Sequence, residues 1–288
     1  MTRRARWTAA LSLAGLGGLA AVFGMGTLLT APVPREIGPP PADLGAEPLT
    51  IPSASGSTLA AWYVPAGSAR RAVVLMHGIR ADRTSLVDRA RLFRESGYHV
   101  LLFDFQAHGE SPGDKITVGW RERHDAIAAV RWIRERHPGL PVAVVGQSMG
   151  GAAALYAGAE LDADALVVES VYGSILEAIA NRIEMRLGSP GRWLAPLLTA
   201  QMPLRLGVPP NALRPAEAVR QVSAPLLVAG GTADAHAPPE EVRRIHANAP
   251  EPKALWLAEG AAHQDLHAFD EVAYRERVLA WLDAVLSA

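Results

Sequence analysis

The sequence predicts an α/β domain with a mostly parallel central sheet and helices on both of its faces. Short apolar runs, rich in valine and leucine and without alternating polar residues, have the pattern of strands that are buried on both faces. They alternate with amphipathic stretches of helical spacing, and this order indicates a doubly wound sheet. The predicted strands are residues 72–76, 100–103, 142–145, 165–168, 226–229 and 254–257.

An antiparallel hairpin is expected at the sheet edge, because residues 49–52 and 58–64 flank a turn rich in serine and glycine. Helices are expected where apolar residues recur at intervals of three or four between charged residues. They cover residues 85–96, the region from Ile127 to Ile133, and residues 240–248 and 271–286.

Length and composition are those of a globular chain with a large core. The 288 residues are 49% hydrophobic, and 28 basic side chains nearly balance 29 acidic ones, for a net charge of -1. We therefore expect neither a disordered protein nor one that binds nucleic acid. The chain contains no cysteine, which excludes disulfides, thiolate metal sites and cysteine nucleophiles.

Residues 1–30 are predicted to form an N-terminal transmembrane anchor or signal segment. Residues 8–30 carry no charge and would form a helix of roughly 35 Å, enough to cross a hydrocarbon core of about 30 Å. Arg3, Arg4 and Arg6 precede this segment, so the rest of the chain is expected on the non-cytoplasmic side, periplasmic or extracellular. The alternatives are a cleaved signal peptide, which gives a secreted protein, and a buried or interfacial helix.

A proline-rich linker, residues 31–47, is expected to lead into a folded domain of residues 48–288. Inside this domain, about 50 residues separate two predicted strands, which is too long for an ordinary connection. We interpret residues 172–222, rich in leucine and interrupted by prolines, as a helical cap over the C-terminal edge of the sheet. An additional helical layer on the core is the alternative.

A candidate nucleophile, Ser148, lies in the pattern G-x-S-x-G at residues 146–150. It directly follows a predicted strand and begins a helical stretch. Gly146 and Gly150 would let the backbone approach closely at such a sharp turn. A second match around Ser111 does not lead directly into a helix, so we favour Ser148.

A serine nucleophile needs a base, and the base needs an acid that orients it. Asp234 and His263 each follow a later predicted strand, at the edge where open α/β sheets gather their sites. We therefore expect Ser148, His263 and Asp234 to form a catalytic triad. His236 as the base and Glu169 as the acid are the alternatives.

A developing oxyanion needs backbone N–H donors. Met149 begins the helix after the nucleophile, and Ile79 follows His77-Gly78 at the end of the first parallel strand. We expect the N–H groups of Ile79 and Met149 to form the oxyanion hole, with His77 as a structural residue of the loop. We find no metal-ligand motif and no dinucleotide-binding motif, and we expect no cofactor.

With these motifs, residues 48–288 resemble the α/β-hydrolase superfamily, in particular its single-domain serine hydrolases of the esterase, lipase and serine-aminopeptidase type. The resemblance implies the α/β-hydrolase fold, the triad and oxyanion hole named above, no cofactor, and a variable cap after the sixth strand. Gln106-Ala107 stand where the pattern D-x-R-G-H-G is commoner, but neither residue belongs to the triad. The resemblance rests on His77-Gly78, residues 104–111, Gly146–Gly150, Asp234 and Gly260-x-x-His263.

The expected function is hydrolysis of a carboxylic ester, thioester or lipid acyl ester through an acyl-enzyme. The leucine-rich cap and the apolar N-terminal segment favour a small or lipid-like acyl substrate near a membrane, with Trp193, Leu197 and Met202 as candidate substrate contacts. A serine peptidase or aminopeptidase acting on short peptides is the nearest alternative. A non-catalytic, membrane-tethered binding module that kept the fold is another.

Overall fold

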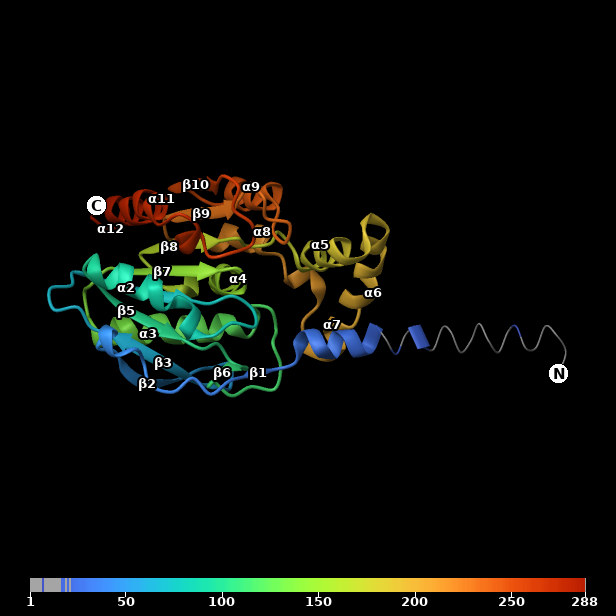
Figure 1. The fold of residues 1–288 in the computed structure, drawn as a ribbon, viewed down its shortest axis with the longest axis horizontal. Coiled ribbons are helices and arrows are strands. Elements are labelled where there is room, and N and C mark those ends of the chain that lie inside the picture. Colours follow the sequence, from blue (N-terminus) through green and yellow to red (C-terminus); the bar gives the residue numbers. More distant parts are fainter. Residues whose placement is uncertain (1–6, 8–16, 19, 21, 288) are drawn as a thin grey trace.

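A computed structural model describes residues 7, 17–18, 20 and 22–287. Its centre is an eight-stranded sheet in the order β10-β9-β8-β7-β4-β5-β3-β2 (Figure 1). Neighbouring strands are parallel except where β3 pairs with β2 and β5. The strands are β2 (Glu47–Pro52), β3 (Thr58–Val64), β4 (Arg71–Met76), β5 (Tyr98–Phe103), β7 (Val142–Gln147), β8 (Ala165–Glu169), β9 (Leu226–Gly231) and β10 (Lys253–Ala258).

The mostly parallel sheet and the antiparallel hairpin are therefore confirmed. Strand β4, in the middle of the sheet, shows why the apolar runs form strands. Ala72, Val74 and Met76 pack into one hydrophobic cluster and Val73 and Leu75 into the other, and all are fully buried. Side chains alternate between the two faces of a strand, so a central strand needs apolar residues at every position.

Helices cover both faces of the sheet. One face packs against α3, α4 and α9, and the other against α2 and the C-terminal helices. In α3, acidic residues in the first turn and arginines in the last turn complement the helix dipole. The α-helices are α2 (Val87–Glu95), α3 (Glu122–Arg136), α4 (Met149–Ala157), α9 (Pro239–Asn248), α10 (Leu266–Phe269), α11 (Glu271–Tyr274) and α12 (Ala280–Leu286). Short 3-10 helices are η1 (Ala42–Leu44), η2 (Arg83–Leu86) and η3 (Gly158–Leu161), and η7 (Arg275–Leu279) is a π-helix between α11 and α12.

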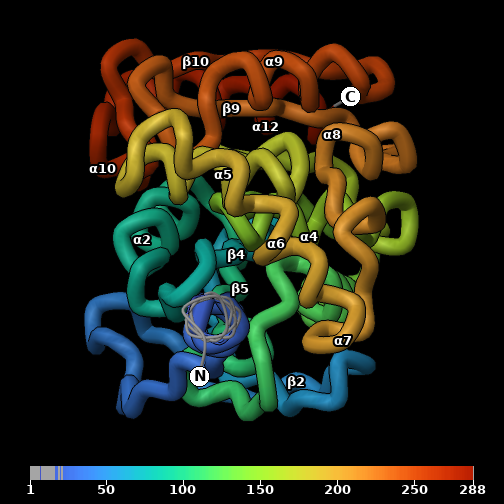
Figure 2. The backbone as a smooth tube through the Cα atoms, turned by 90° about the vertical axis from the view of Figure 1, so that its right-hand side faces the viewer, coloured from blue at the N-terminus to red at the C-terminus, as the bar shows by residue number. Residues whose placement is uncertain are grey.

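The long interval after β8, the sixth strand of the sheet along the chain, folds into a series of mostly short helices. They are α5 (Ile175–Leu187), η4 (Ser189–Leu194), α6 (Ala195–Thr199), α7 (Met202–Leu206), η5 (Pro210–Ala212), α8 (Pro215–Ala218) and η6 (Val219–Gln221). Prolines occupy the first turns of several of them, where a missing N–H costs no helical hydrogen bond. In Figures 1 and 2, α5, α6 and α7 gather at one end of the molecule, beside the N-terminal helix.

Residues ahead of the sheet also pack on the domain. Residues 22–30 are helical, and β1 (Val33–Pro34) pairs in parallel with β6 (His108–Gly109). Leu44 is fully buried in the second hydrophobic cluster. The proline-rich stretch expected as a linker is thus extended, but it is held against the domain by hydrogen bonds and burial.

The predicted membrane anchor lies partly outside the described residues, at positions 8–16, 19 and 21. Within the part of the chain that the structure describes, no helix combines the length and the hydropathy needed to cross a bilayer. The anchor stays a prediction from the sequence.

Candidate active site

Ser148 lies in a sharp turn between β7 and α4. Its φ of 50° and ψ of -110° fall in a region that residues with side chains rarely adopt. The Ser148 N–H donates to the Glu169 carbonyl at 2.7 Å, which ties this turn to the neighbouring strand β8. A strained strand-to-helix turn of this kind is typical of a nucleophilic serine presented at the edge of a sheet.

Two glycines make this turn possible. A Cβ on Gly146 would lie 2.6 Å from the Gly151 nitrogen, and a Cβ on Gly150 would lie 2.6 Å from the Met76 carbonyl oxygen. No side chain fits at such distances, so both positions require glycine. The close contact with Met76 also places α4 directly against the end of β4.

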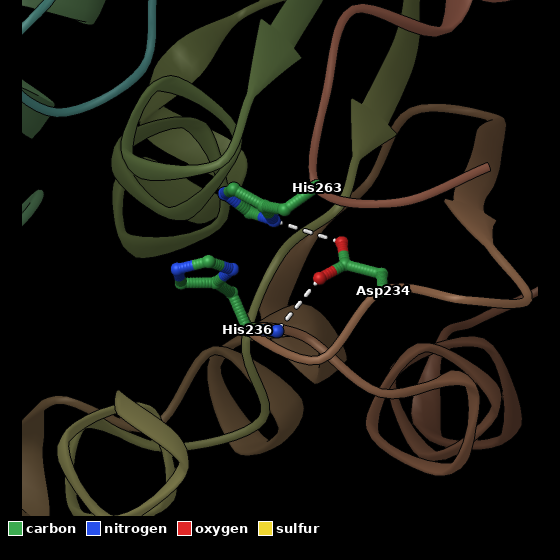
Figure 3. A group of neighbouring side chains, drawn as sticks. All are labelled: Asp234, His236 and His263. Carbon is green, nitrogen blue, oxygen red and sulfur yellow. Dashed lines mark hydrogen bonds and ion pairs between the residues drawn. The ribbon is translucent and has the colours of Figure 1, made fainter. Parts of the chain in front are cut away.

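Asp234 and His263 lie beyond the ends of β9 and β10, and their side chains meet (Figure 3). Asp234 Oδ2 lies 2.8 Å from His263 Nδ1, while Oδ1 accepts hydrogen bonds from the N–H groups of His236 and Ala237 at 2.8 and 2.9 Å. Ser148 lies at the same edge of the sheet. No hydrogen bond joins its hydroxyl to His263 among the described residues.

The Asp234 carboxylate is buried and held ionised. Burial by itself would raise the pKa of Asp234, but the hydrogen bond and the charge of His263 and the N–H groups of Ala237 and His236 outweigh it and lower that pKa below its usual value. A buried, ionised carboxylate on Nδ1 fixes the imidazole orientation and leaves Nε2 free to act as a base.

His236 contacts the pair from one side. Its imidazole lies against the ring of His263, with the centroids 4.8 Å apart, but only its backbone N–H bonds to Asp234 (Figure 3). Burial, helped by the charges of His263 and Arg182, lowers the pKa of His236. The carboxylate therefore orients His263 and not His236.

The same three side chains form a candidate metal-binding group, because one ligand atom of each lies within 4.8 Å of the others. Both oxygens of Asp234 already accept hydrogen bonds. Asp234 and His263 therefore bind each other, and a metal ion at this position would have to displace these hydrogen bonds.

Glu169, the alternative acid, belongs to a separate buried network. Its Oε2 lies 2.7 Å from Arg89 Nη2, and its Oε1 accepts a hydrogen bond from the Tyr274 hydroxyl at 2.6 Å. Arg89 is fully buried and neutralises this carboxylate. Of the two acids considered from the sequence, Asp234 is the one that contacts His263.

The loop after β4 lies against Ser148. A Cβ on Gly78 would be 3.7 Å from the Ser148 Cβ. For the N–H groups of Ile79 and Met149, no hydrogen-bond acceptor is found among the described residues, and both residues line the pocket that contains Ser148. Two free donors beside a nucleophile are what an oxyanion hole requires.

His77 holds this loop in place. Its Nδ1 donates to the Gly78 carbonyl at 2.7 Å, and its Nε2 accepts from the Phe105 N–H at 3.1 Å. Complete burial, helped by the charge of His108, lowers the pKa of His77 to about 3, so the ring is neutral. Both ring nitrogens are engaged with backbone groups, which makes His77 a structural residue.

Ser111, in the second G-x-S-x-G match, is also structural. Its buried Oγ donates to the Asp104 carbonyl at 2.7 Å and accepts from the Ala60 N–H at 2.9 Å. These bonds join the loop after β5 to β3 and leave the Ser111 hydroxyl no role as a nucleophile.

A pocket beside Ser148 is lined mainly by aliphatic side chains. Of the predicted cap contacts, Met202 lines it, whereas Trp193 and Leu197 lie outside the lining and are 84% and 52% exposed. Leu198 lines the pocket in place of Leu197, because adjacent helical residues point in different directions. The domain contributes Ile79, Val118, Ser148, Met149, Tyr172, Ile175, Ala178, Ile179, Arg182, Leu198, Met202, Arg205 and Leu206.

The sequence did not indicate that the N-terminal helix also contributes to this pocket. Gly26, Leu29 and Thr30 are part of its lining. They lie in the apolar run that predicts a membrane anchor. The glycines within that run are the sequence feature that could have indicated close packing of this helix against the domain.

Comparisons with known proteins agree with this geometry. The chain is 27% identical to the uncharacterized protein YqkD of Bacillus subtilis, over 81% of this chain and 78% of that protein. It is 31% identical to the mouse lysophosphatidylserine lipase ABHD12 over 40% of this chain and 31% of the relative. Among solved structures, the Pyrococcus furiosus esterase Pf2001 is similar, with a TM-score of 0.74 and 25% identity, covering 88% of this chain and 98% of that one.

These similarities, the sheet order and the strand-to-helix turn confirm the predicted α/β-hydrolase fold. A family match spans residues 67–214, which is more than half of the chain. The chain therefore belongs to the serine hydrolase family described as serine aminopeptidase, S33.

Proposed function

We propose that this protein is a carboxylic ester hydrolase that uses Ser148 as nucleophile, His263 as general base and Asp234 as the acid that orients the base. The observation that carries the proposal is the Asp234–His263 pair, at 2.8 Å, at the sheet edge where the strained turn holds Ser148. Catalytic hydrogen bonds are often long in free enzymes and tighten when substrate binds, so the unpaired Ser148 hydroxyl is compatible with this role.

The reaction proceeds in two halves. Ser148 Oγ attacks the ester carbonyl carbon while His263 Nε2 takes its proton, and the N–H groups of Ile79 and Met149 stabilise the oxyanion. The alcohol leaves with the proton from His263, and an acyl-enzyme remains. Water then attacks this acyl group, again with His263 as base, and releases the carboxylic acid and free Ser148. No step needs a cofactor.

The pocket favours an ester with an apolar acyl group over a peptide. Its lining is mainly aliphatic and includes two arginines, Arg182 and Arg205, but no aspartate or glutamate among the described residues. An aminopeptidase needs an acidic group to bind the substrate's α-ammonium. The names of the similar esterase and lipase support the same choice, although the family name refers to an aminopeptidase.

We also propose that the apolar N-terminal segment attaches the protein to a membrane, with the hydrolase domain on the non-cytoplasmic side. Because residues 22–30 pack on the domain, this attachment depends on the apolar residues that precede them. The support is the uncharged apolar run after three arginines. A lipid-like acyl substrate would then be supplied by the same membrane.

The test uses the full chain in detergent with a fluorophosphonate probe and with p-nitrophenyl esters and aminoacyl-anilides as substrates. We expect the parent protein to be labelled and to hydrolyse esters, and Ser148→Ala to lose labelling and at least about 10³-fold in kcat/KM. Heat-denatured parent protein is the control for nonspecific labelling. Labelling that persists in Ser148→Ala would exclude this nucleophile, and turnover of anilides alone would favour the peptidase.

A further inference from the structure

The helix of residues 22–30 ends beside the proposed nucleophile. Gly26, Leu29 and Thr30 line the same pocket as Ser148. Gly26 is buried, while the residues on either side of it in the helix are exposed. Figure 1 shows this helix next to α7, and Figure 2 shows it from the end of the molecule where the cap helices gather.

Side chains of the cap bind this helix. Arg205 Nη1 donates to Thr27 Oγ1 at 2.8 Å, its Nη2 donates to the Phe23 carbonyl, and its guanidinium lies over the Phe23 ring at 3.9 Å. Gln201 Nε2 donates to the Val22 carbonyl at 3.1 Å, and Gln201 Oε1 accepts from Arg205 Nε at 2.9 Å. The two side chains therefore act together as a clamp from α7 and the residue before it.

The catalytic domain holds the other side of the helix. Arg80, the residue after Ile79 of the proposed oxyanion hole, donates from Nη1 to the Leu28 carbonyl at 3.3 Å. The Ile116 N–H donates to the Thr30 carbonyl at 2.8 Å. The end of the helix is thus bound to both the cap and the domain, and it forms part of the pocket lining between them.

We propose that the end of this helix is a wall of the acyl-binding pocket, and that Gly26 and Arg205 set the length of acyl chain that the enzyme accepts. This inference rests on the proposed ester hydrolase function. A Cβ on Gly26 would lie 2.8 Å from Arg205 Nε and 2.9 Å from Gln201 Oε1. A larger residue at position 26 must therefore displace this clamp or occupy the pocket.

One consequence concerns processing of the N-terminus. Cleavage after the apolar run, as in a secreted protein, would remove Gly26 and Leu29 and open the pocket to solvent. The proposal therefore requires that the active enzyme keeps this helix, so that the segment predicted as an anchor also selects the substrate.

The first experiment compares Gly26→Leu with Gly24→Leu in the full chain, using p-nitrophenyl esters from acetate to dodecanoate. Gly24 is exposed on the same helix, and a Cβ there would meet no atom within 4 Å. We expect Gly26→Leu to lower the ratio of kcat/KM for dodecanoate to that for acetate by at least about tenfold, and Gly24→Leu to leave this ratio unchanged. Superimposable chain-length profiles for the two variants would overturn the proposal.

A second experiment reads the packing without catalysis. Because the chain has no cysteine, Gly26→Cys and Gly24→Cys each introduce a single thiol. We expect a maleimide to modify the thiol at position 26 at least about tenfold more slowly than that at position 24, and Arg205→Gln to reduce this protection. Equal modification rates at positions 26 and 24 would show that the helix is not packed on the domain and would overturn the proposal that it forms a pocket wall. Protection at position 26 in a protein that hydrolyses no ester would instead contradict the proposed function.

Discussion

The loops at the edge of the sheet and the segments around the pocket are built in different ways. At the edge, a Cβ on Gly146 or Gly150 would lie 2.6 Å from a backbone atom, Asp234 is buried, and His77 is fully enclosed. Around the pocket, the cap helices are short and leave large apolar side chains exposed, such as Trp193.

This difference separates catalysis from substrate selection. Chemistry needs a few groups held in one geometry, and a buried sheet edge with no free space provides it. Substrate choice needs side chains that can change without disturbing that geometry, and the cap residues Leu198 and Leu206 line the pocket from helices separate from the strand-to-helix turn. We expect substitutions at the sheet edge to lower catalysis or stability strongly, and substitutions in the cap to change selectivity.

The largest effect is expected when the base is removed. His263→Gln should lower kcat/KM for p-nitrophenyl acetate by about 10³-fold or more, since Ser148 loses its proton acceptor. The matched control is His236→Gln, whose side chain lies next to His263 but does not bond to Asp234, and which should lose less than about tenfold. If His236→Gln lowered kcat/KM more than His263→Gln does, His236 would be the base.

The second comparison concerns folding stability. Gly150→Ala places a Cβ 2.6 Å from the Met76 carbonyl oxygen and should lower the free energy of unfolding by several kcal/mol, at least about 3. Gly67→Ala is the control, because a Cβ there meets no atom within 4 Å and should change that free energy by less than about 0.5 kcal/mol. Urea denaturation measures both. Equal changes in the free energy of unfolding for the two variants would mean that the backbone at the sheet edge can rearrange to fit a Cβ.

The third prediction is a pH dependence. The unfolded His77 binds a proton below about pH 6.5, whereas burial keeps the folded ring neutral down to about 3. The unfolded state therefore takes up more protons in this interval, and His77 makes the free energy of unfolding fall as the pH falls. Between about pH 7 and 5 the parent should lose about 2 kcal/mol more than His77→Gln. Parallel pH profiles for the two proteins would contradict the neutral, buried ring.

The smallest effect is expected on the outer side of the cap. Leu204 is 94% exposed, while Leu206 on the same short helix lines the pocket. Leu206→Ala should lower kcat/KM for long esters by roughly tenfold, since it removes apolar contact with the acyl group. Leu204→Ala should leave the ester profile unchanged. If Leu204→Ala lowered kcat/KM for the long esters in detergent, the acyl group would also contact the outer face of the cap.

Most of the sheet could be predicted from the sequence. Each of the six apolar runs forms a strand whose ends differ by at most two residues from the prediction. The hairpin follows the serine- and glycine-rich turn. Such features depend on residues near one another in the chain, because a strand buried on both faces needs consecutive apolar side chains and a sharp turn needs glycine.

The candidate site was predictable where a residue lies at or shortly after the carboxyl end of a strand, as Ser148, Asp234 and His263 do. The sequence favoured Asp234 over Glu169 as the acid but did not give their partners, which are His263 for Asp234 and Arg89 for Glu169. These partners lie far apart in the sequence.

The sequence by itself determined the alternating strands and helices, the glycine-framed Ser148 and the chain order of Ser148, Asp234 and His263. The tertiary structure alone decided which segments line the pocket. Residues 22–30 have the composition of a membrane segment, and only their contacts with Arg205, Gln201 and Arg80 show that they also face Ser148. Local patterns reflect which residues need burial, whereas the partner that buries them depends on the packing of the whole chain.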